Sequence, residues 1–318
     1  MFSPETFGLM RRLARLAIPA LSLSLLVGCA SQEASGPSPA RTSAAAPEPS
    51  PDPSSPGTSP GRYDYTFRLP IAEYSYTDAE YEVIRSAEQV LARDCMKGFG
   101  LTYRPPESSA PVAAQDRRYG ITDLDSARRY GYRMPPLPAA PKAKLTKDQI
   151  TVLYGKRSLE NGADDRAKLE YRGKEVPDNG CLGKAILDFR KPYEYREGSA
   201  AASRIAGDSY EASLSAPKVQ AAFKEWSTCM KQKGYDYPSP VDAIQSPSFL
   251  KGKVSAKERE TAAADVACKR STGLLETWFE TESAIQKDMI KKDVTLLRKL
   301  DELHGKKLRA ARKILAEA

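Results

Sequence analysis

The stretch CMKGFGLTY at residues 95–103 sets the architecture that this sequence predicts, because its pattern, C-M-K-x-x-G-x-x-Y, returns as CMKQKGYDY at residues 229–237. Each copy ends an amphipathic helical pattern and is followed closely by a proline, Pro105 or Pro238. A glycine after the last helical turn supplies the left-handed residue that ends many helices. The two copies therefore predict two helices of one design.

The helix before the first copy is predicted to begin at a capping box. In Thr77-Asp78-Ala79-Glu80, a hydroxyl and a carboxylate three residues apart each bond the backbone N–H of the other, and Tyr76 with Tyr81 suits a hydrophobic staple. Gly98 or Gly100 is expected to end this helix. One helical face then carries Ile84, Ala87, Leu91 and Cys95. We expect Cys95 to point into the core.

The helix before the second copy is predicted to start at Pro217, which suits a first helical turn, and to stop at Gly234. Cys229 falls at the margin of its apolar stripe. The stripe itself consists of Val219, Ala222, Phe223, Trp226 and Met230. This helix is expected to bury that stripe in the core.

Helices are expected over most of the remaining domain. One covers residues 124–130, and another opens at the capping box Thr146-Lys147-Asp148-Gln149, with Leu145 and Ile150 as its staple. Ser255 caps a long helical region that runs to the C-terminus, with expected breaks near residues 271–273 and at Gly305. The fold class expected is all-α, mostly helical.

The first 28 residues have the parts of an export signal, a basic stretch and then an apolar one. The apolar stretch, residues 16–27, is too short for a bilayer core of about 30 Å. The residues that close it, Leu26, Val27, Gly28 and Cys29, match the lipobox of bacterial lipoproteins. This resemblance implies diacylglyceryl transfer to Cys29, cleavage after Gly28 and a location on the outer face of the cell membrane. The alternative is ordinary secretion with a chance cysteine.

Residues 29–61 are predicted to be a disordered tether rich in Pro, Ser and Ala. Eight prolines lie between Pro37 and Pro60, and large apolar side chains are almost absent, so the stretch cannot bury a core. The rest of the chain is divided into a helical domain at residues 62–284 and a basic C-terminal helix at residues 285–318. Those last residues carry ten Lys or Arg against five Asp or Glu.

The positive charge has two interpretations, a solvated face and a surface for anionic partners outside the cytoplasm. The whole chain carries a net charge of +8. A basic helix on an exported protein suits anionic lipid headgroups or wall polymers, whereas nucleic acid is a poor partner in that compartment. A solvated face whose lysines serve solubility is the interpretation that we favour for the same helix.

Four cysteines besides Cys29 are expected to form two disulfides, because an even number of cysteines in an oxidising compartment favours pairing. Three pairings are possible. Since each C-M-K unit is followed later by one further cysteine, the order favours Cys95 with Cys181 and Cys229 with Cys268. A redox or metal role is the alternative, but the sequence has no C-x-x-C and a single histidine, His304.

Several of these features together resemble the secreted lipoproteins that are abundant in high-GC Gram-positive bacteria such as streptomycetes. They are the paired cysteine units, the stretch from Arg117-Arg118-Tyr119-Gly120 to Gly131-Tyr132, the helix start at Gly180-Cys181 and the proline-rich tether. The resemblance covers most of the chain after residue 28. It implies a compartment and a fold, and it brings no activity with it.

The sequence offers little catalytic machinery, so the expected function is non-enzymatic binding or scaffolding in the cell envelope, without cofactor or metal. The partner is a wall polymer, an envelope protein or the membrane surface. One alternative is a wall-acting hydrolase or transferase with paired carboxylates, for which the candidates are Asp123 with Asp125 and Asp164 with Asp165. The other is a solute-binding lipoprotein, although alternating strands and helices are lacking. Clustered tyrosines, at positions 63, 65, 74, 76 and 81, suit either glycan stacking or packing on the core.

Overall fold

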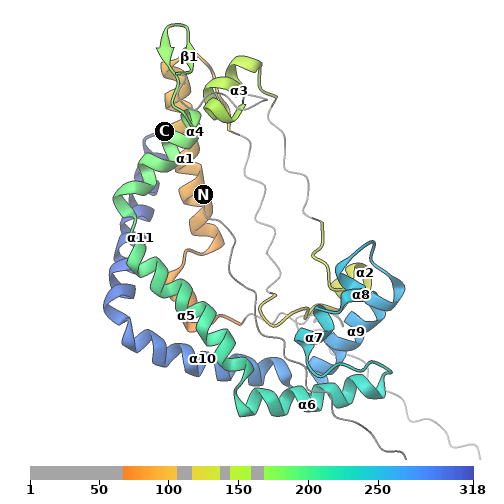
Figure 1. Ribbon diagram of the computed structural model, residues 1–318. Helices are drawn as coiled ribbons and strands as arrows, with labels where there is room; N and C mark the ends of the chain where they lie inside the picture. Colours follow the sequence, from red (N-terminus) through yellow and green to blue (C-terminus); the bar gives the residue numbers. More distant parts are fainter. Residues whose placement is uncertain (1–66, 106–116, 137–143, 159–167) are drawn as a thin grey trace, which may run out of the picture. The chain divides into compact units, whose positions relative to one another are not determined.

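The computed structural model describes residues 67–105, 117–136, 144–158 and 168–318 (Figure 1). The lipobox residues Leu26, Val27, Gly28 and Cys29 and the predicted tether at 29–61 lie outside these ranges. Within them the fold is mostly helical, as the sequence predicts. The tertiary structure described below belongs to this part of the chain.

The long helices of the described chain are α1 (Asp78–Gly98), α4 (Gly180–Arg190), α5 (Arg196–Leu214), α6 (Pro217–Gln232), α9 (Ala256–Ser271), α10 (Leu274–Lys292) and α11 (Val294–Ala316). The short ones are η1 (Pro70–Tyr74), α2 (Leu124–Tyr130), α3 (Lys147–Tyr154), η2 (Gly155–Ser158), η3 (Lys191–Tyr193), α7 (Pro240–Ile244) and α8 (Pro247–Leu250). Strands β1 (Glu170–Tyr171) and β2 (Lys174–Glu175) form an antiparallel pair in which Glu170 faces Glu175.

Helix α1 begins as predicted and buries a slightly different face. The Thr77 N–H donates to Glu80 Oε2 at 2.8 Å, and the Glu80 N–H donates to Thr77 Oγ1 at 3.3 Å. Its fully buried side chains in the last two turns are Ala92 and Met96, whereas Cys95 is only half-buried. Cys95 still packs against the apolar cluster around Met96, where it is bonded to the fully buried Cys181 on α4.

Helix α6 matches its prediction residue by residue. Pro217 occupies the first turn, and Gly234 follows the helix with a left-handed φ of 86°. Cys229 lies at the margin of the buried face. All five residues of the predicted stripe are buried: Val219, Ala222, Phe223, Trp226 and Met230. The same glycine position ends α1, where Gly100 has a φ of 72°.

The C-terminal helices break once where expected and once elsewhere. Gly273, with a left-handed φ of 62°, separates α9 from α10. The second break lies at Asp293, so the expected break at Gly305 is wrong, and α11 runs through that glycine. A glycine inside a helix costs about 1 kcal/mol, which the buried Leu300 and Leu308 on either side offset by packing. The basic segment 285–318 thus comprises the end of α10 and all of α11.

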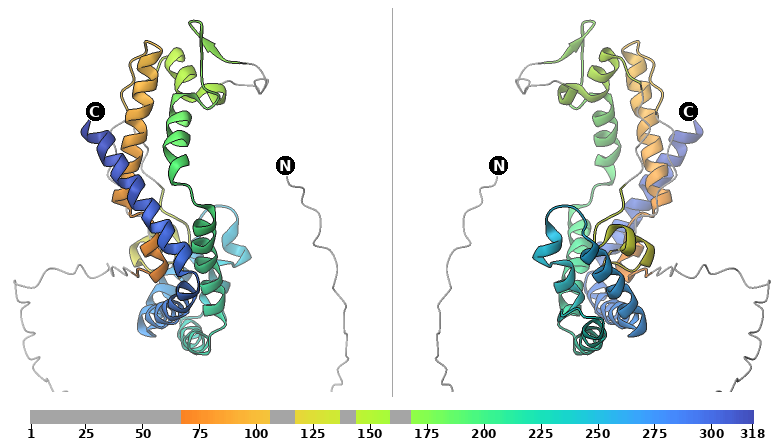
Figure 2. Two further views of the ribbon diagram at one scale, coloured as in Figure 1. Left: turned by 90° about the vertical axis from the view of Figure 1, so that its left-hand side faces the viewer. Right: turned by 90° about the vertical axis from the view of Figure 1, so that its right-hand side faces the viewer.

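Apolar side chains gather in clusters that join helices distant in sequence. One cluster joins α1, α3 and α4 around Met96 and Leu153, and another joins α6, α9 and α10 around Trp226 and Trp278. Helix α11 lies beside α1 in both views of Figure 2 and packs against it through a third cluster that includes Leu308. The helical domain therefore depends on long-range packing between its first and last helices.

His304 on α11 packs against Tyr76, just before α1, and we expect this contact to depend on pH. Its ring lies 4.2 Å from that of Tyr76, and burial lowers its pKa, with a further lowering from Lys307 against opposing effects of Asp301 and Glu80. A histidine whose pKa falls on folding stabilises the native state above its unfolded pKa of about 6.5, and this contribution is lost as pH falls.

We expect His304→Gln to reduce the loss of unfolding free energy between pH 7.5 and pH 5.5, measured by urea denaturation of wild type and variant. The variant must be compared with wild type because Glu88 also titrates with a shifted pKa. Burial raises the pKa of Glu88, so that Glu88 stabilises the native state as pH falls, opposite to the effect of His304. An unchanged slope in the variant would contradict the assignment to His304.

Candidate functional site

Two disulfides join helices at the ends of the two C-M-K units. Cys95 on α1 is bonded to Cys181 on α4, with Cα atoms 5.6 Å apart, and Cys229 on α6 is bonded to Cys268 on α9, with Cα atoms 5.7 Å apart. These are the two pairs that the sequence order favours. Both bonds lie against apolar clusters, so their chemistry in this structure is that of cross-links.

We expect the double variant Cys95→Ser/Cys181→Ser to lose more stability than Cys229→Ser/Cys268→Ser. The first bond spans 86 residues and the second 39. Restriction of the unfolded chain then gives about 4.6 and about 3.9 kcal/mol, an estimate from loop entropy alone. Guanidinium denaturation of the two variants tests this order, and a first variant as stable as wild type would refute the cross-linking role.

Arg-Arg-Tyr-Gly occurs at residues 117–120 and again at 128–131. The segment that holds both copies, residues 117–133, is bound to α9 and α10 by buried charged side chains. The first of these is Glu282, whose side chain is fully buried. It accepts hydrogen bonds from the Arg118 guanidinium and from the Tyr119 hydroxyl, the latter at 2.8 Å. Ser209 on α5 donates to the same carboxylate at 2.9 Å. One buried acid thus connects this segment with α5 and α10.

The second buried carboxylate is Asp265, which forms an ion pair with Lys269 one turn along α9. Both side chains have zero exposure, and Lys269 Nζ lies 3.0 Å from Asp265 Oδ2. Trp226 Nε1 donates to Asp265 at 2.9 Å, and Lys269 Nζ donates to the Ile121 carbonyl at 3.1 Å. Burial raises the pKa of Asp265 and lowers that of Lys269. Burial thus opposes the charged form of each side chain, and the charge of its partner favours it.

The third is Glu258, which is 1% exposed. It accepts from the Tyr132 N–H at 3.3 Å and from Arg133 Nε at 3.4 Å. The backbone approaches it at Gly131, where an added Cβ would lie 2.7 Å from Glu258 Cγ. At Gly120, an added Cβ would lie 2.9 Å from Lys269 Nζ. A side chain at Gly120 or Gly131 would therefore collide with the buried Lys269 or Glu258.

Sequence reasoning missed these carboxylates because charged residues on helices are usually solvated. One signal was present. Apolar residues recur at every seventh position from Leu275 on α10 to Leu303 on α11, and Glu282 interrupts this series. The contacts described for these acids are internal ones, so the arrangement positions a segment and presents no free carboxylate to a substrate.

Of the two carboxylate pairs proposed from the sequence, only Asp123 with Asp125 lies within the described residues. Asp123 caps α2, accepting from the Ser126 N–H at 2.7 Å, and Asp125 is exposed on the first turn of that helix. Asp164 and Asp165 lie outside the described residues. Among the described tyrosines, Tyr76 stacks edge-on against Tyr81 at 5.3 Å, as the predicted staple requires. Tyr74 lies elsewhere, at the wall of a cavity.

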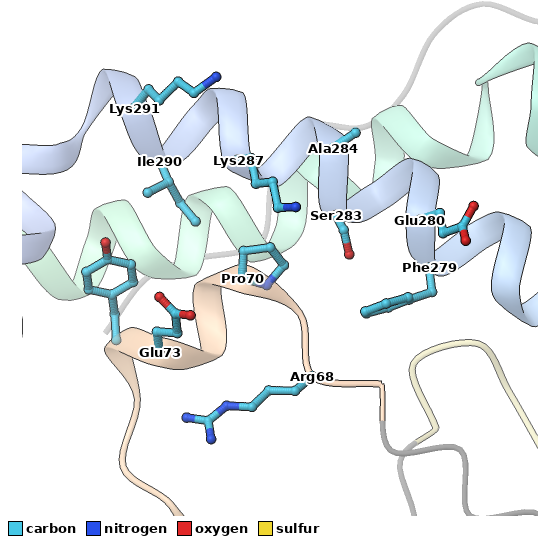
Figure 3. Close-up of a pocket in the computed structure, with 11 residues that line it drawn as sticks. Arg68, Pro70, Glu73, Phe279, Glu280, Ser283, Ala284, Lys287, Ile290 and Lys291 are labelled. Atoms are coloured by element: carbon cyan, nitrogen blue, oxygen red, sulfur yellow. The ribbon is translucent and has the colours of Figure 1, made fainter.

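That cavity, of about 680 Å³, lies between α10 and the segment from Arg68 to Tyr74 (Figure 3). Ser283 and Lys287 extend from α10 toward Pro70 on the other wall. Two glutamates also line it, but Figure 3 shows Glu73 and Glu280 at opposite ends, with carboxylates that do not point toward one another. The cavity is therefore lined by residues of both charges.

The exposed face of α11 is cationic. Lys306 and Lys313 each pair with an acid one turn away on the same helix. Lys307 instead turns inward, where its Nζ lies 3.8 Å from Glu88. The other exposed cations of α11 are Arg298, Lys299, Arg309 and Arg312. The surface charge is thus real, although one of the ten basic residues of segment 285–318 belongs to the interior.

The described ranges contain neither a candidate metal site nor a candidate membrane-spanning helix. No group of three or more His, Cys, Asp or Glu side chains there is placed to hold a metal ion. No described helix combines the length and the apolar character needed to cross a bilayer. No family model matches this chain, and the searches of curated proteins and of solved structures find no match either.

Proposed function

We propose that this protein is a lipid-anchored protein of the outer face of the cell membrane, in which a disulfide-stabilised helical domain is carried on a tether from Cys29. Its role is binding or scaffolding in the cell envelope, and no catalytic step is assigned to it. Its partners are anionic components of that envelope, for which the cationic face of α11 is one complementary surface.

The observation that carries this proposal is the use of the cysteines. All four cysteines outside the lipobox are paired in two disulfides inside the helical domain. Structural disulfides of this kind are typical of exported proteins and rare in a reducing cytosol. They support the compartment that the lipobox at Leu26–Cys29 predicts, and a diacylglyceryl group on Cys29 would keep the exported domain at the membrane.

The geometry gives less support to the two other functions, a hydrolase and a solute-binding lipoprotein. A carboxylate-dependent hydrolase needs two acids converging in a cleft, an arrangement that Figure 3 does not display for Glu73 and Glu280. A solute-binding lipoprotein with two α/β lobes needs parallel sheets, whereas the described chain has one pair of two-residue strands. The binding role is therefore the function that the geometry supports best.

The Cys29→Ser variant tests this proposal when wild type and variant are produced in a Gram-positive host and followed by cell fractionation. We expect wild type in the membrane fraction and the variant in the medium. Ser38→Ala, in the same tether, is the matched control and should remain with the membrane. Membrane association of Cys29→Ser equal to that of wild type would overturn the lipid anchor.

A further inference from the structure

Two exposed apolar side chains, Leu250 and Met134, belong to segments that are distant in sequence. Leu250 is the last residue of the short helix α8 and is 62% exposed, and Met134, a few residues after α2, is 56% exposed. No other Leu, Ile or Met side chain in the described ranges is exposed to this extent. Single exposed apolar residues are ordinary, whereas exposed apolar residues that gather at one place mark interaction sites.

The residues that precede Leu250 and Met134 hold the two segments together. Arg133 Nη2 donates to the Phe249 carbonyl at 2.6 Å, and the ring centroids of Tyr132 and Phe249 lie 5.7 Å apart. The Phe249 side chain is 3% exposed, so it fastens α8 to the domain. Leu250 and Met134 each follow a residue that is fixed in this way, and both therefore lie in one region of the surface, beside α2 and α8 (Figure 1).

The exposed charges of these two segments have one sign. Residues 126–136 and 246–259 contain seven Lys or Arg and a single acid, Glu258, which is 1% exposed. In the described chain no ion pair forms at the exposed lysines that follow Leu250, which are Lys251, Lys253 and Lys257. On α11, by contrast, two exposed lysines pair with acids on the same helix. The cations near α8 are thus the less neutralised set.

Apolar side chains among cations of one sign suit the surface of an anionic bilayer. Leu and Met side chains can enter the boundary between headgroups and acyl chains, while lysines contact the headgroups. A wall polymer would neutralise the lysines but would leave Leu250 and Met134 in water. An apolar groove on another protein would cover Leu250 and Met134 but would leave the lysines without anions. A membrane of anionic lipid satisfies both kinds of side chain.

We propose that Leu250 and Met134, with the lysines that follow Leu250, form a membrane-contact site that docks the domain on an anionic lipid surface. The proposal rests on the proposed function for the presence of a membrane beside the domain, and it does not depend on the lipid at Cys29. The chain from Cys29 to Phe67 could span at most about 130 Å, so the anchor alone does not fix which face meets the membrane. The membrane-contact site would fix it.

A contact of this size is weak and reversible by itself. Release of the Cys29→Ser variant into the medium is therefore still expected, because washing and dilution remove a protein that is held only in this way. Vesicles at high lipid concentration are needed to measure the contact.

The test uses the chain from residue 29 to 318 with Cys29→Ser, which carries no lipid. Co-sedimentation over a range of lipid concentrations measures its partitioning onto phosphatidylglycerol vesicles and, for comparison, onto phosphatidylcholine vesicles. We expect binding to the anionic vesicles and at least about tenfold weaker binding to the neutral ones. Met134→Gln/Leu250→Gln should weaken binding to phosphatidylglycerol by about tenfold or more, because it removes the apolar side chains that leave water.

The charge of the site is tested by Lys251→Gln/Lys253→Gln, which should also weaken binding by about tenfold. Its matched control is Lys306→Gln/Lys313→Gln on α11, which removes the same charge from another exposed face. The matched control for the apolar variant is Leu187→Gln on α4, where the leucine is 41% exposed. Both controls should bind nearly as wild type does.

Leu250→Trp reports insertion directly. The native Trp226 and Trp278 are buried, so a change in emission on addition of vesicles belongs to the new indole. We expect a blue shift with phosphatidylglycerol vesicles and none with phosphatidylcholine vesicles, since the indole leaves water only where the domain docks.

The membrane-contact site is overturned if wild type does not bind phosphatidylglycerol vesicles, if Met134→Gln/Leu250→Gln binds as wild type does, or if a control variant loses as much affinity as the variant it matches. Vesicle-bound Leu250→Trp without a blue shift would also overturn it. Thermal unfolding of each variant shows that the fold is retained. Because the protein in this test lacks the lipid, a negative result leaves the fractionation of Cys29→Ser to decide the proposed function separately.

Discussion

Lys269→Met is expected to lower the free energy of unfolding by about 3–5 kcal/mol, because it leaves the fully buried Asp265 carboxylate without its counter-ion. The Trp226 indole would still donate to that carboxylate, but one neutral hydrogen bond does not replace the ion pair. The variant also removes the bond from Lys269 to the Ile121 carbonyl, so residues 117–133 should become less protected against hydrogen exchange.

A double variant distinguishes loss of the charge pair from loss of packing. Asp265→Asn/Lys269→Met has no buried charge at this position and keeps an acceptor for Trp226, so we expect it to recover a large part of the lost stability. Urea denaturation at pH 7 measures both. If the double variant is no more stable than Lys269→Met, the electrostatic explanation is wrong.

Glu282→Gln is expected to have the second large effect, a loss of about 3 kcal/mol, because it removes the charge that Arg118 faces on the buried side of α10. Tyr119, which donates to the same carboxylate, packs against Trp278 with ring centroids 4.9 Å apart. We therefore expect the near-ultraviolet circular dichroism of the folded variant to change as well as its unfolding midpoint.

The matched control for Glu282→Gln is Glu302→Gln on α11. Glu302 is exposed and pairs with Lys306 at 2.6 Å, a surface ion pair that water and salt screen. The same chemical change should therefore have a small effect there. Equal losses in the two variants would mean that burial of Glu282 in a hydrogen-bond network does not determine its contribution.

Local signals in the sequence predicted much of the helical structure. The capping box at Thr77, the first-turn proline at Pro217 and the left-handed Gly273 each act within one turn of chain, so their outcomes follow from nearby residues alone. The break at Gly305 was wrong for the complementary reason. Its cost is local, whereas the packing of α11 against α1 that offsets it joins residues more than 200 positions apart.

The buried charges could not be located in the same way. Asp265 and Lys269 have an i, i+4 spacing that on most helices marks a solvated pair, and only tertiary packing against Trp226 and Ile121 buries them. The cavity beside Ser283 likewise depends on η1 lying across α10, from more than 200 residues away. Such features arise from contacts between distant segments, which leave no periodic signal in the sequence.

Together, these contacts give residues 117–133 a structural role. The segment is linked to α9 and α10 through Glu258, Glu282 and the Asp265 partner Lys269, while the disulfides link α1 to α4 and α6 to α9. The two disulfides are suited to an environment without reducing agents. We regard this as further support for a function outside the cytoplasm.

The most direct test is the intact mass of the protein isolated from membranes and treated with an alkylating reagent without prior reduction. We predict a chain that begins at Cys29, carries a diacylglyceryl modification there, and has no alkyl group on Cys95, Cys181, Cys229 or Cys268. A chain that retains residues 1–28, or alkylation of those four cysteines, would contradict the proposal of an exported, lipid-anchored and disulfide-stabilised domain.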